Sequence, residues 1–119
     1  MRNFRDLEVW KCSVMLVKKI YFITGKFPKE EKFGLVSQIN RCAVSIPSNI
    51  AEGCSRTSQK DFSRFLQISL GSSFELETQI EIAKEIGFIA DSVCSEIILE
   101  LNIIQKRIQS LKKFVDTKS

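Results

Sequence analysis

The sequence contains no histidine, no closely paired cysteines and no long apolar run, and each absence excludes a class of protein. Without histidine the chain lacks the base of Ser-His-Asp and Cys-His catalytic sets, and it lacks the commonest metal ligand. No two of the four cysteines show the Cys-x-x-Cys spacing, so we expect free thiols packed as small apolar side chains: Cys12, Cys42, Cys54 and Cys94. We therefore expect a protein that is not an enzyme, with no catalytic residues, no metal site and no cofactor.

The sequence also gives no sign of a membrane segment. No apolar run approaches the roughly 18 residues that a helix needs to cross a bilayer. The first eleven residues, MRNFRDLEVWK, carry charges where a signal peptide has its apolar region. We expect a cytoplasmic protein without membrane contact, and the length of 119 residues fits a single domain over residues 1–119.

The net charge of +4 is distributed unevenly along the chain. Residues 1–60 carry eleven Lys and Arg against five Asp and Glu, whereas residues 61–119 carry seven against nine. A basic half of this kind fits contact with a phosphate backbone, as in RNA or DNA. Solvated lysines on an ordinary helix surface give the same composition, so this interpretation remains open beside the first.

Apolar residues recur at three- and four-residue spacings along nearly the whole chain. This periodicity predicts four helices, over about 6–25, 30–52, 58–86 and 90–114. Glycine or proline follows each of the first three, and Thr57 or Ser58 stands where it can cap the third. Short connections between long amphipathic helices make neighbours antiparallel, so we predict an all-α, up-and-down antiparallel four-helix bundle.

The first predicted helix carries two apolar strips. The spacing of the first strip places it on one side of the helix: Leu7, Trp10, Val14, Val17, Tyr21 and Thr24. The second is expected to serve another interface: Val9, Leu16, Ile20, Ile23 and Phe27. Together they cover about 200° of the helix, which is wider than a single bundle contact requires.

The second predicted helix has few charges, because Arg41 is the only charged residue between Phe33 and Ala51. A bundle helix normally exposes a charged face to water, so we expect another subunit to cover its outer side. Its polar residues form one stripe at 3-4-4-3 spacing: Gln38, Arg41, Ser45, Asn49 and Glu52. We interpret this stripe as a structural polar seam between helices or at an oligomer interface; the alternative is the solvated edge of the helix.

A withdrawn Arg41 would need an anion, because an unpaired buried charge costs several kcal/mol. Glu75 on the third helix, in the same chain or in a neighbour, is the expected partner. On that third helix Leu70 and Phe74 are four residues apart among polar positions, which predicts an exposed patch for contact with another copy or a protein partner.

The residues expected to contact phosphates belong to the polar side of the first helix and to the segment before it: Arg2, Arg5, Lys11, Lys18, Lys19 and Lys26. Lysines at helical spacing give affinity without base specificity. We expect no aromatic pair beside them for base stacking. A metal held by Glu52, Glu75 and Glu77 in the bundle core is a further alternative, which the lack of histidine disfavours.

Three stretches, FRDLEVWK, FGLVSQINRCAVSIPSNIAEGCSR and DFSRFLQISLGSSFELETQI, resemble in order and spacing the bacterial 23S rRNA-intervening-sequence (S23) proteins. The resemblance covers about residues 3–110. It implies an up-and-down four-helix bundle that assembles as a ring-like homopentamer, with no catalytic motif. The chain is similar, more distantly, to the accessory variability protein of diversity-generating retroelements, a basic pentameric barrel that engages nucleic acid and a reverse transcriptase.

From these observations we expect a non-enzymatic homo-oligomer that binds RNA or DNA weakly and without sequence specificity. The alternative is a structural or protein-binding adaptor without nucleic-acid contact.

Overall fold

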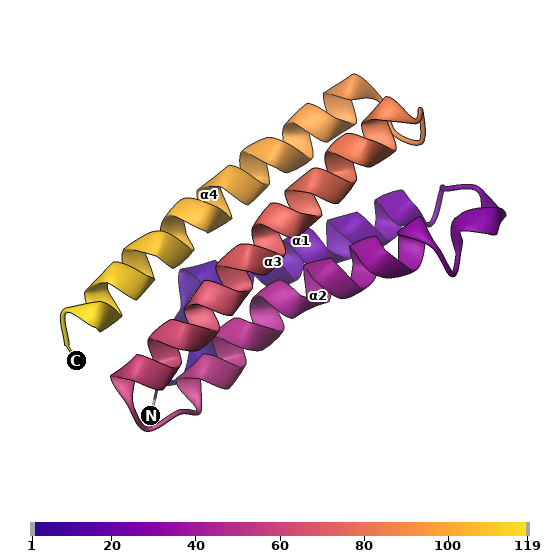
Figure 1. Ribbon diagram of the computed structural model, residues 1–119. Coiled ribbons are helices and arrows are strands. Elements are labelled where there is room, and N and C mark those ends of the chain that lie inside the picture. The colour runs from indigo at the N-terminus through magenta and orange to yellow at the C-terminus, as the bar shows by residue number, and fades with distance from the viewer. Residues whose placement is uncertain (1, 119) are drawn as a thin grey trace.

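The computed structural model describes residues 2–118, and within that range the chain forms helices and no strand. The long helices are α1 (Glu8–Thr24), α2 (Leu35–Cys54), α3 (Gln59–Glu85) and α4 (Asp91–Asp116). Two short 3-10 turns, η1 (Phe4–Asp6) and η2 (Lys29–Glu31), precede α1 and α2. The helices lie side by side along an axis of 45 Å, and both chain ends lie at the same end of the molecule (Figure 1). The four-helix, all-α prediction is confirmed.

The helix ends differ from the sequence-based bounds mainly at the start of α2, which begins at Leu35 instead of residue 30. The residues before it form the 3-10 turn η2, and Gly34 has a non-helical backbone with φ −108° and ψ −112°. The carboxylate of Glu31 accepts a hydrogen bond from the Leu35 N–H at 3.3 Å, so the turn caps the helix. At the C-terminal end of the bundle, α4 extends two residues past the predicted end, to Asp116.

Helix α3 is bounded by two local signals. Its N-cap is Ser58, one of the two candidates that the sequence offered, and the Ser58 hydroxyl accepts a hydrogen bond from the Asp61 N–H at 3.0 Å. At its other end Gly87 adopts φ 85°, a left-handed conformation that glycine enters without steric cost. The chain then reverses into α4, and the Phe88 N–H donates to the carbonyl of Ala83 at 2.9 Å.

One face of each helix builds the core. The core faces of α2 and α4 include these fully covered residues: Ile39, Ala43, Ile46, Ile50, Leu101 and Ile108. Serines of α3 also lie in the core because their hydroxyls find partners there. Ser69 donates to the Ile46 carbonyl at 2.9 Å, and Ser73 donates to the Leu70 carbonyl at 2.6 Å. The four cysteines are free thiols, and only Cys12 is not fully buried.

The two apolar strips of α1 are buried to different extents. The second strip is the more deeply buried one, with Val9, Leu16 and Ile20 covered. In the first strip Val14 and Tyr21 are exposed, but Thr24 is buried, and Leu7, Trp10 and Val17 pack against the core. The buried side of α1 also includes Ser13, whose hydroxyl donates to the Val9 carbonyl at 2.6 Å and so needs no water. A polar residue on the true core face made that face harder to recognise.

The prediction of an exposed Leu70–Phe74 patch is wrong for one of its two members. Phe74 is 47% exposed, but Leu70 is only 6% exposed. Leu70 lines a hollow together with Gln109 and Lys113 of the last turns of α4. Of the predicted pair, only Phe74 is exposed. No helix among residues 2–118 is both long and apolar enough to span a membrane.

Candidate functional site

Four of the six predicted seam residues meet at one hollow between α2 and α3. Gln38, Arg41 and Ser45 come from α2, Glu75 comes from α3, and the hollow has a volume of about 440 Å³. Its remaining lining residues are Phe33, Ser37, Cys42, Ser72 and Gln79. We call this the α2–α3 hollow. The α2 residues that line it belong to the segment in which Arg41 is the only charged residue.

A chain of hydrogen bonds crosses from α2 to α3 at the edge of this hollow. The hydroxyl oxygens of Ser45 and Ser72 are 2.8 Å apart. The Asn49 amide donates to both the carbonyl and the hydroxyl of Ser45, at 2.8 and 2.9 Å. The structure therefore joins Ser45 and Asn49 to α3 through Ser72. Glu52 stands apart, because its carboxylate pairs with Arg56 at 3.5 Å near the end of α2.

Arg41 and Glu75 do not form an ion pair within one chain, so of the two predicted pairings only the one between neighbouring copies stays a prediction. No ion pair among residues 2–118 includes either of them, and both side chains are exposed. Because Arg41 is in contact with water, a single chain imposes no burial cost that a partner must offset. Beside them Gln79 is only 7% exposed, and its Oε1 atom has no hydrogen-bond partner among the described residues.

Glu75 does act on the neighbouring thiol of Cys42. Burial raises the pKa of this thiol to about 12, and the negative charge and hydrogen bond of Glu75 add to the effect. The thiol donates to the Ser72 carbonyl at 3.1 Å. Cys42 is therefore a neutral, structural thiol on the floor of the hollow and not a nucleophile.

The structure does not bring the six predicted phosphate-contact residues into one patch. Arg2 lies against α3, where its guanidinium donates to Gln59 at 3.0 Å. Lys11 is 3.4 Å from Glu8. Lys19 reaches across to α4 and pairs with Glu96 at 3.1 Å and Glu100 at 2.5 Å. Hydrogen bonds from both carboxylates raise the pKa of Lys19.

Arg5 lies over the Phe4 ring at 4.8 Å and has no carboxylate partner in the described part of the chain. It belongs to η1, before the first turn of α1. Its position places one exposed cation at the start of α1, separate from the lysines further along the helix.

Lys18 on the exposed side of α1 and Lys26, two residues past the end of α1, are both exposed, together with two aromatic side chains. Tyr21 is 50% and Phe22 is 67% exposed, and the Lys26 ammonium lies 4.3 Å from the centre of the Phe22 ring. The expectation that no aromatic pair lies beside these lysines is wrong. Phe22 lies four residues from each lysine, a spacing that could have revealed the stripe, but Tyr21 had been counted with the first apolar strip. We call Lys18, Tyr21, Phe22 and Lys26 the α1 stripe.

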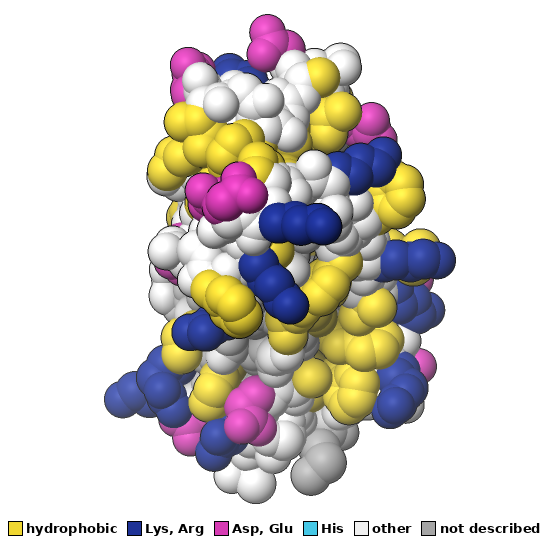
Figure 2. All heavy atoms as spheres, turned by 90° about the vertical axis from the view of Figure 1, so that its right-hand side faces the viewer, with side chains coloured by type: hydrophobic (Ala, Val, Ile, Leu, Met, Phe, Trp, Pro, Cys, Tyr) yellow, Lys and Arg dark blue, Asp and Glu magenta, His cyan; other side chains and the backbone are white. Residues whose placement is uncertain are grey.

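Such mixing of cationic and apolar side chains is not confined to α1. Figure 2 shows Lys and Arg side chains spread among hydrophobic ones over one face of the molecule. Exposed apolar side chains of this size are candidates for contact with another molecule.

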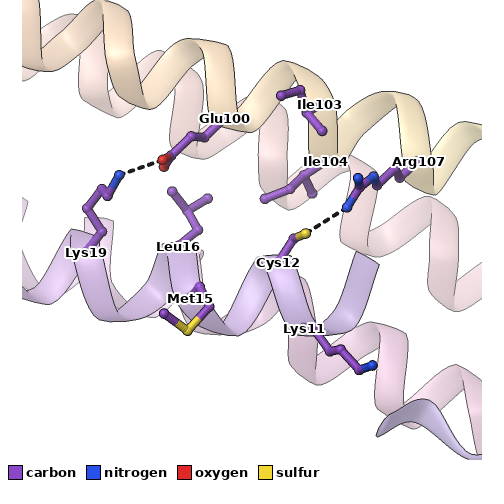
Figure 3. A pocket seen from close by; sticks show the side chains of 9 residues that line it. All are labelled: Lys11, Cys12, Met15, Leu16, Lys19, Glu100, Ile103, Ile104 and Arg107. Atoms are coloured by element: carbon purple, nitrogen blue, oxygen red, sulfur yellow. Dashed lines mark hydrogen bonds and ion pairs between the residues drawn. The ribbon is translucent and has the colours of Figure 1, made fainter. Parts of the chain in front are cut away.

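Sequence reasoning missed a groove between α1 and α4. Its volume is about 510 Å³, and its walls combine apolar side chains of both helices with a few charged ones. Figure 3 shows Leu16 and Ile104 between the two helices, with the Lys19–Glu100 ion pair on one side and the Arg107–Cys12 hydrogen bond on the other. The groove could not be predicted from the sequence, because it depends on the distance between α1 and α4. These two helices contact each other less than α1 and α2, α2 and α3, or α3 and α4 do.

The three carboxylates considered as a metal site lie apart. Glu77 accepts a hydrogen bond from Gln105 at 2.9 Å, Glu52 pairs with Arg56, and Glu75 lines the α2–α3 hollow. Between residues 2 and 118, no three Asp, Glu, Cys or His side chains are grouped closely enough to hold a metal ion.

Comparison with known proteins gives a family and a fold. The sequence model of a family described as 23S rRNA-intervening sequence protein matches residues 5–110. A crystal structure of a protein with unknown function from the S23 ribosomal protein family of Bacteroides thetaiotaomicron VPI-5482 is similar, with a TM-score of 0.82 and 27% identity. The similarity covers 88% of this chain and 95% of that one. No curated protein matches the chain.

Proposed function

Because this chain belongs to the 23S rRNA-intervening sequence protein family, we propose that it is a non-enzymatic helical protein that assembles with copies of itself and binds nucleic-acid backbones weakly. The α1 stripe is the observation that carries nucleic-acid binding. The charge-poor outer side of α2 supports assembly.

The α1 stripe combines the two groups that sequence-independent binding of single strands uses. Lys18 and Lys26 have no carboxylate partner among residues 2–118, so their charges are available to phosphates. The exposed rings of Tyr21 and Phe22 can stack on bases, which are accessible in a single strand but not in a duplex. We therefore propose single-stranded RNA or DNA as the ligand. Arg5 at the start of α1 and Lys11 with its exposed pair can add weaker contacts.

Assembly is proposed at the outer side of α2, around the α2–α3 hollow. Phe33 at its edge is 89% exposed in the single chain, and Arg41 and Glu75 there lack ionic partners. Arg41 of one copy facing Glu75 of the next would pair both charges and cover the apolar side chains. Phe74, on the same helix as Glu75, would add apolar contact. We propose that the assembly is a ring-like homopentamer. The distant similarity to the accessory variability protein, which is a pentameric barrel, favours this number of copies.

Binding to fluorescently labelled single-stranded RNA and DNA across a salt series tests the proposal. The unmodified protein is expected to lose affinity steeply with salt. Replacing both lysines, Lys18→Gln with Lys26→Gln, should weaken binding and make the logarithmic salt slope shallower by about 1.4, since each single-strand phosphate contact contributes about 0.7. Lys60→Gln, which removes an exposed charge from α3, is the matched control and should change little.

A separate variant tests the proposed stacking of bases on the exposed aromatic rings. Phe22→Ala is expected to weaken single-strand binding by about 1–3 kcal/mol while leaving the salt slope unchanged, because a stacked base contributes contact and no counterion release. Equal affinity for duplex and single strand would contradict this part.

The second candidate is a structural or protein-binding adaptor without nucleic-acid contact. It is favoured by the intramolecular pairing of Lys11 and Lys19, which leaves a smaller free basic surface than the sequence suggested. An absence of nucleic-acid binding even at low salt would support this candidate and exclude the first.

A further inference from the structure

The groove between α1 and α4 is apolar at its base and open at its mouth. Leu16 and Ile104 are buried at the base, while Met15 and Ile103 are exposed at the mouth. Figure 3 shows Leu16 and Ile104 projecting into the space between the two helices. A volume of about 510 Å³ lies within the range of roughly 300–1,000 Å³ that small-molecule sites occupy.

The two sides of the groove differ in charge. Lys19 is neutralised there by Glu100 and Glu96, so that side offers no free cation. On the other side the Arg107 guanidinium donates to the sulfur of Cys12 at 2.7 Å, and no ion pair among residues 2–118 includes Arg107. A thiol is a weak acceptor, so this contact leaves the positive charge of Arg107 uncompensated.

An apolar groove with one uncompensated guanidinium is complementary to a molecule with a hydrocarbon chain and one anionic end. A guanidinium presents two parallel N–H groups that match the two oxygens of a carboxylate. The stretch of α1 from Cys12 to Lys19 is about 10 Å long, which suits a chain of medium length. We propose that this groove binds a medium-chain fatty acid, with its carboxylate on Arg107 and its chain over Leu16 and Ile104.

Cys12 provides a reporter inside the groove, because it is the one cysteine of the four that is not fully buried. In the folded protein a water-soluble aromatic disulfide reagent should react first with Cys12. Dodecanoate below its micelle concentration is expected to slow this reaction saturably. Affinity should rise about fourfold for each methylene from hexanoate to octanoate, as buried hydrocarbon predicts, and rise less in longer chains that extend past the groove.

Calorimetric titration with dodecanoate tests the position of the carboxylate independently of the thiol. Arg107→Gln should weaken dodecanoate binding at least tenfold and leave the binding of dodecanol unchanged. Lys113→Gln removes one charge from the same helix outside the groove and should bind dodecanoate like the unmodified protein. Circular dichroism of each variant confirms that it is folded.

The proposal is overturned if dodecanoate neither protects Cys12 nor gives heat, or if Arg107→Gln binds dodecanoate as tightly as the unmodified protein. It is also overturned if Cys12 becomes protected with rising protein concentration alone, because a second copy of the chain would then occupy the groove. None of these outcomes depends on Lys18 and Lys26, so they are separate from the nucleic-acid test.

Discussion

Cys42 is the residue at which the core of the bundle and the α2–α3 hollow meet. Its thiol donates to the Ser72 carbonyl of the neighbouring helix, and the carboxylate of Glu75 lies close enough to disfavour the thiolate. Burial is the larger cause of the raised pKa. A thiolate at this position would lose its solvation and repel Glu75, so the folded state depends on the neutral form.

This dependence predicts an alkaline loss of stability. The pKa of Cys42 is about 12 in the folded state against an ordinary value of 9.0, so the unfolded state loses its proton first as the pH rises. Stability from this group is fully present below pH 9 and falls by about 1.4 kcal/mol per pH unit between 9 and 12. Chemical denaturation of the unmodified protein and of Cys42→Ala over this range should show a shallower decline for the variant. Parallel declines would contradict the assignment.

At the scale of elements, α2 and α3 pack closely near the turn that joins them. Gly53, in the last turn of α2, stands against the side chains of two aromatic residues of α3. A Cβ atom at this position would be 2.8 Å from Cδ1 of Phe62 and 3.0 Å from Cβ of Phe65. Because Phe62 is itself buried in the core, it has little room to move. The final glycine of SIPSNIAEG is therefore explained by close helix packing.

We expect Gly53→Ala to lower the free energy of unfolding. The added Cβ overpacks the contact with α3, which costs about 1–3 kcal/mol. The higher helix propensity of alanine offsets only roughly 1 kcal/mol of this cost. Gly71→Ala in α3 is the matched control, because a Cβ there meets nothing within 4 Å. The control should stabilise by up to about 1 kcal/mol. Thermal melts of the two variants should therefore shift in opposite directions. A stabilised Gly53→Ala protein would show that the two helices can separate at low cost.

At the scale of the whole molecule, the α2–α3 hollow is open to solvent in a single chain. A single chain leaves Arg41 and Glu75 in the same hollow without a direct ion pair, beside a highly exposed Phe33. The proposed contact between copies would pair these charges across the interface. Pairing of opposite charges at an interface contributes to specificity as well as to affinity.

Arg41→Ala is expected to weaken or dissociate the assembly, because it would leave Glu75 of the neighbouring copy unpaired. Sedimentation velocity over a hundredfold range of protein concentration measures this. The charge exchange Arg41→Glu with Glu75→Arg should restore assembly that either single change disrupts. An unmodified protein that sediments as a single chain at every concentration would refute the proposed interface.

Much of the α2–α3 region could be predicted from the sequence because its signals are local. Arg41 and Ser45 lie on one helix at a fixed spacing, so their common face follows from helix geometry. Whether Arg41 and Glu75 pair within one chain did not follow from the sequence in the same way, because it depends on side-chain reach between two helices, and the structure leaves the two unpaired. The α1 stripe was missed for a related reason, since both sides of α1 are apolar enough to be mistaken for the core.

The sequence by itself determined the all-α class, the four helices and most of their ends, and it carried the family resemblance. It could do so because periodicity, caps and glycine stops act within a few residues of one another. Only the tertiary structure decided which side of α1 is buried, that Leu70 is covered, and that Lys19 is neutralised by carboxylates 77 and 81 residues away. These outcomes depend on how each helix is rotated against its neighbours, and the energy that sets this rotation comes from the packing of all four helices together.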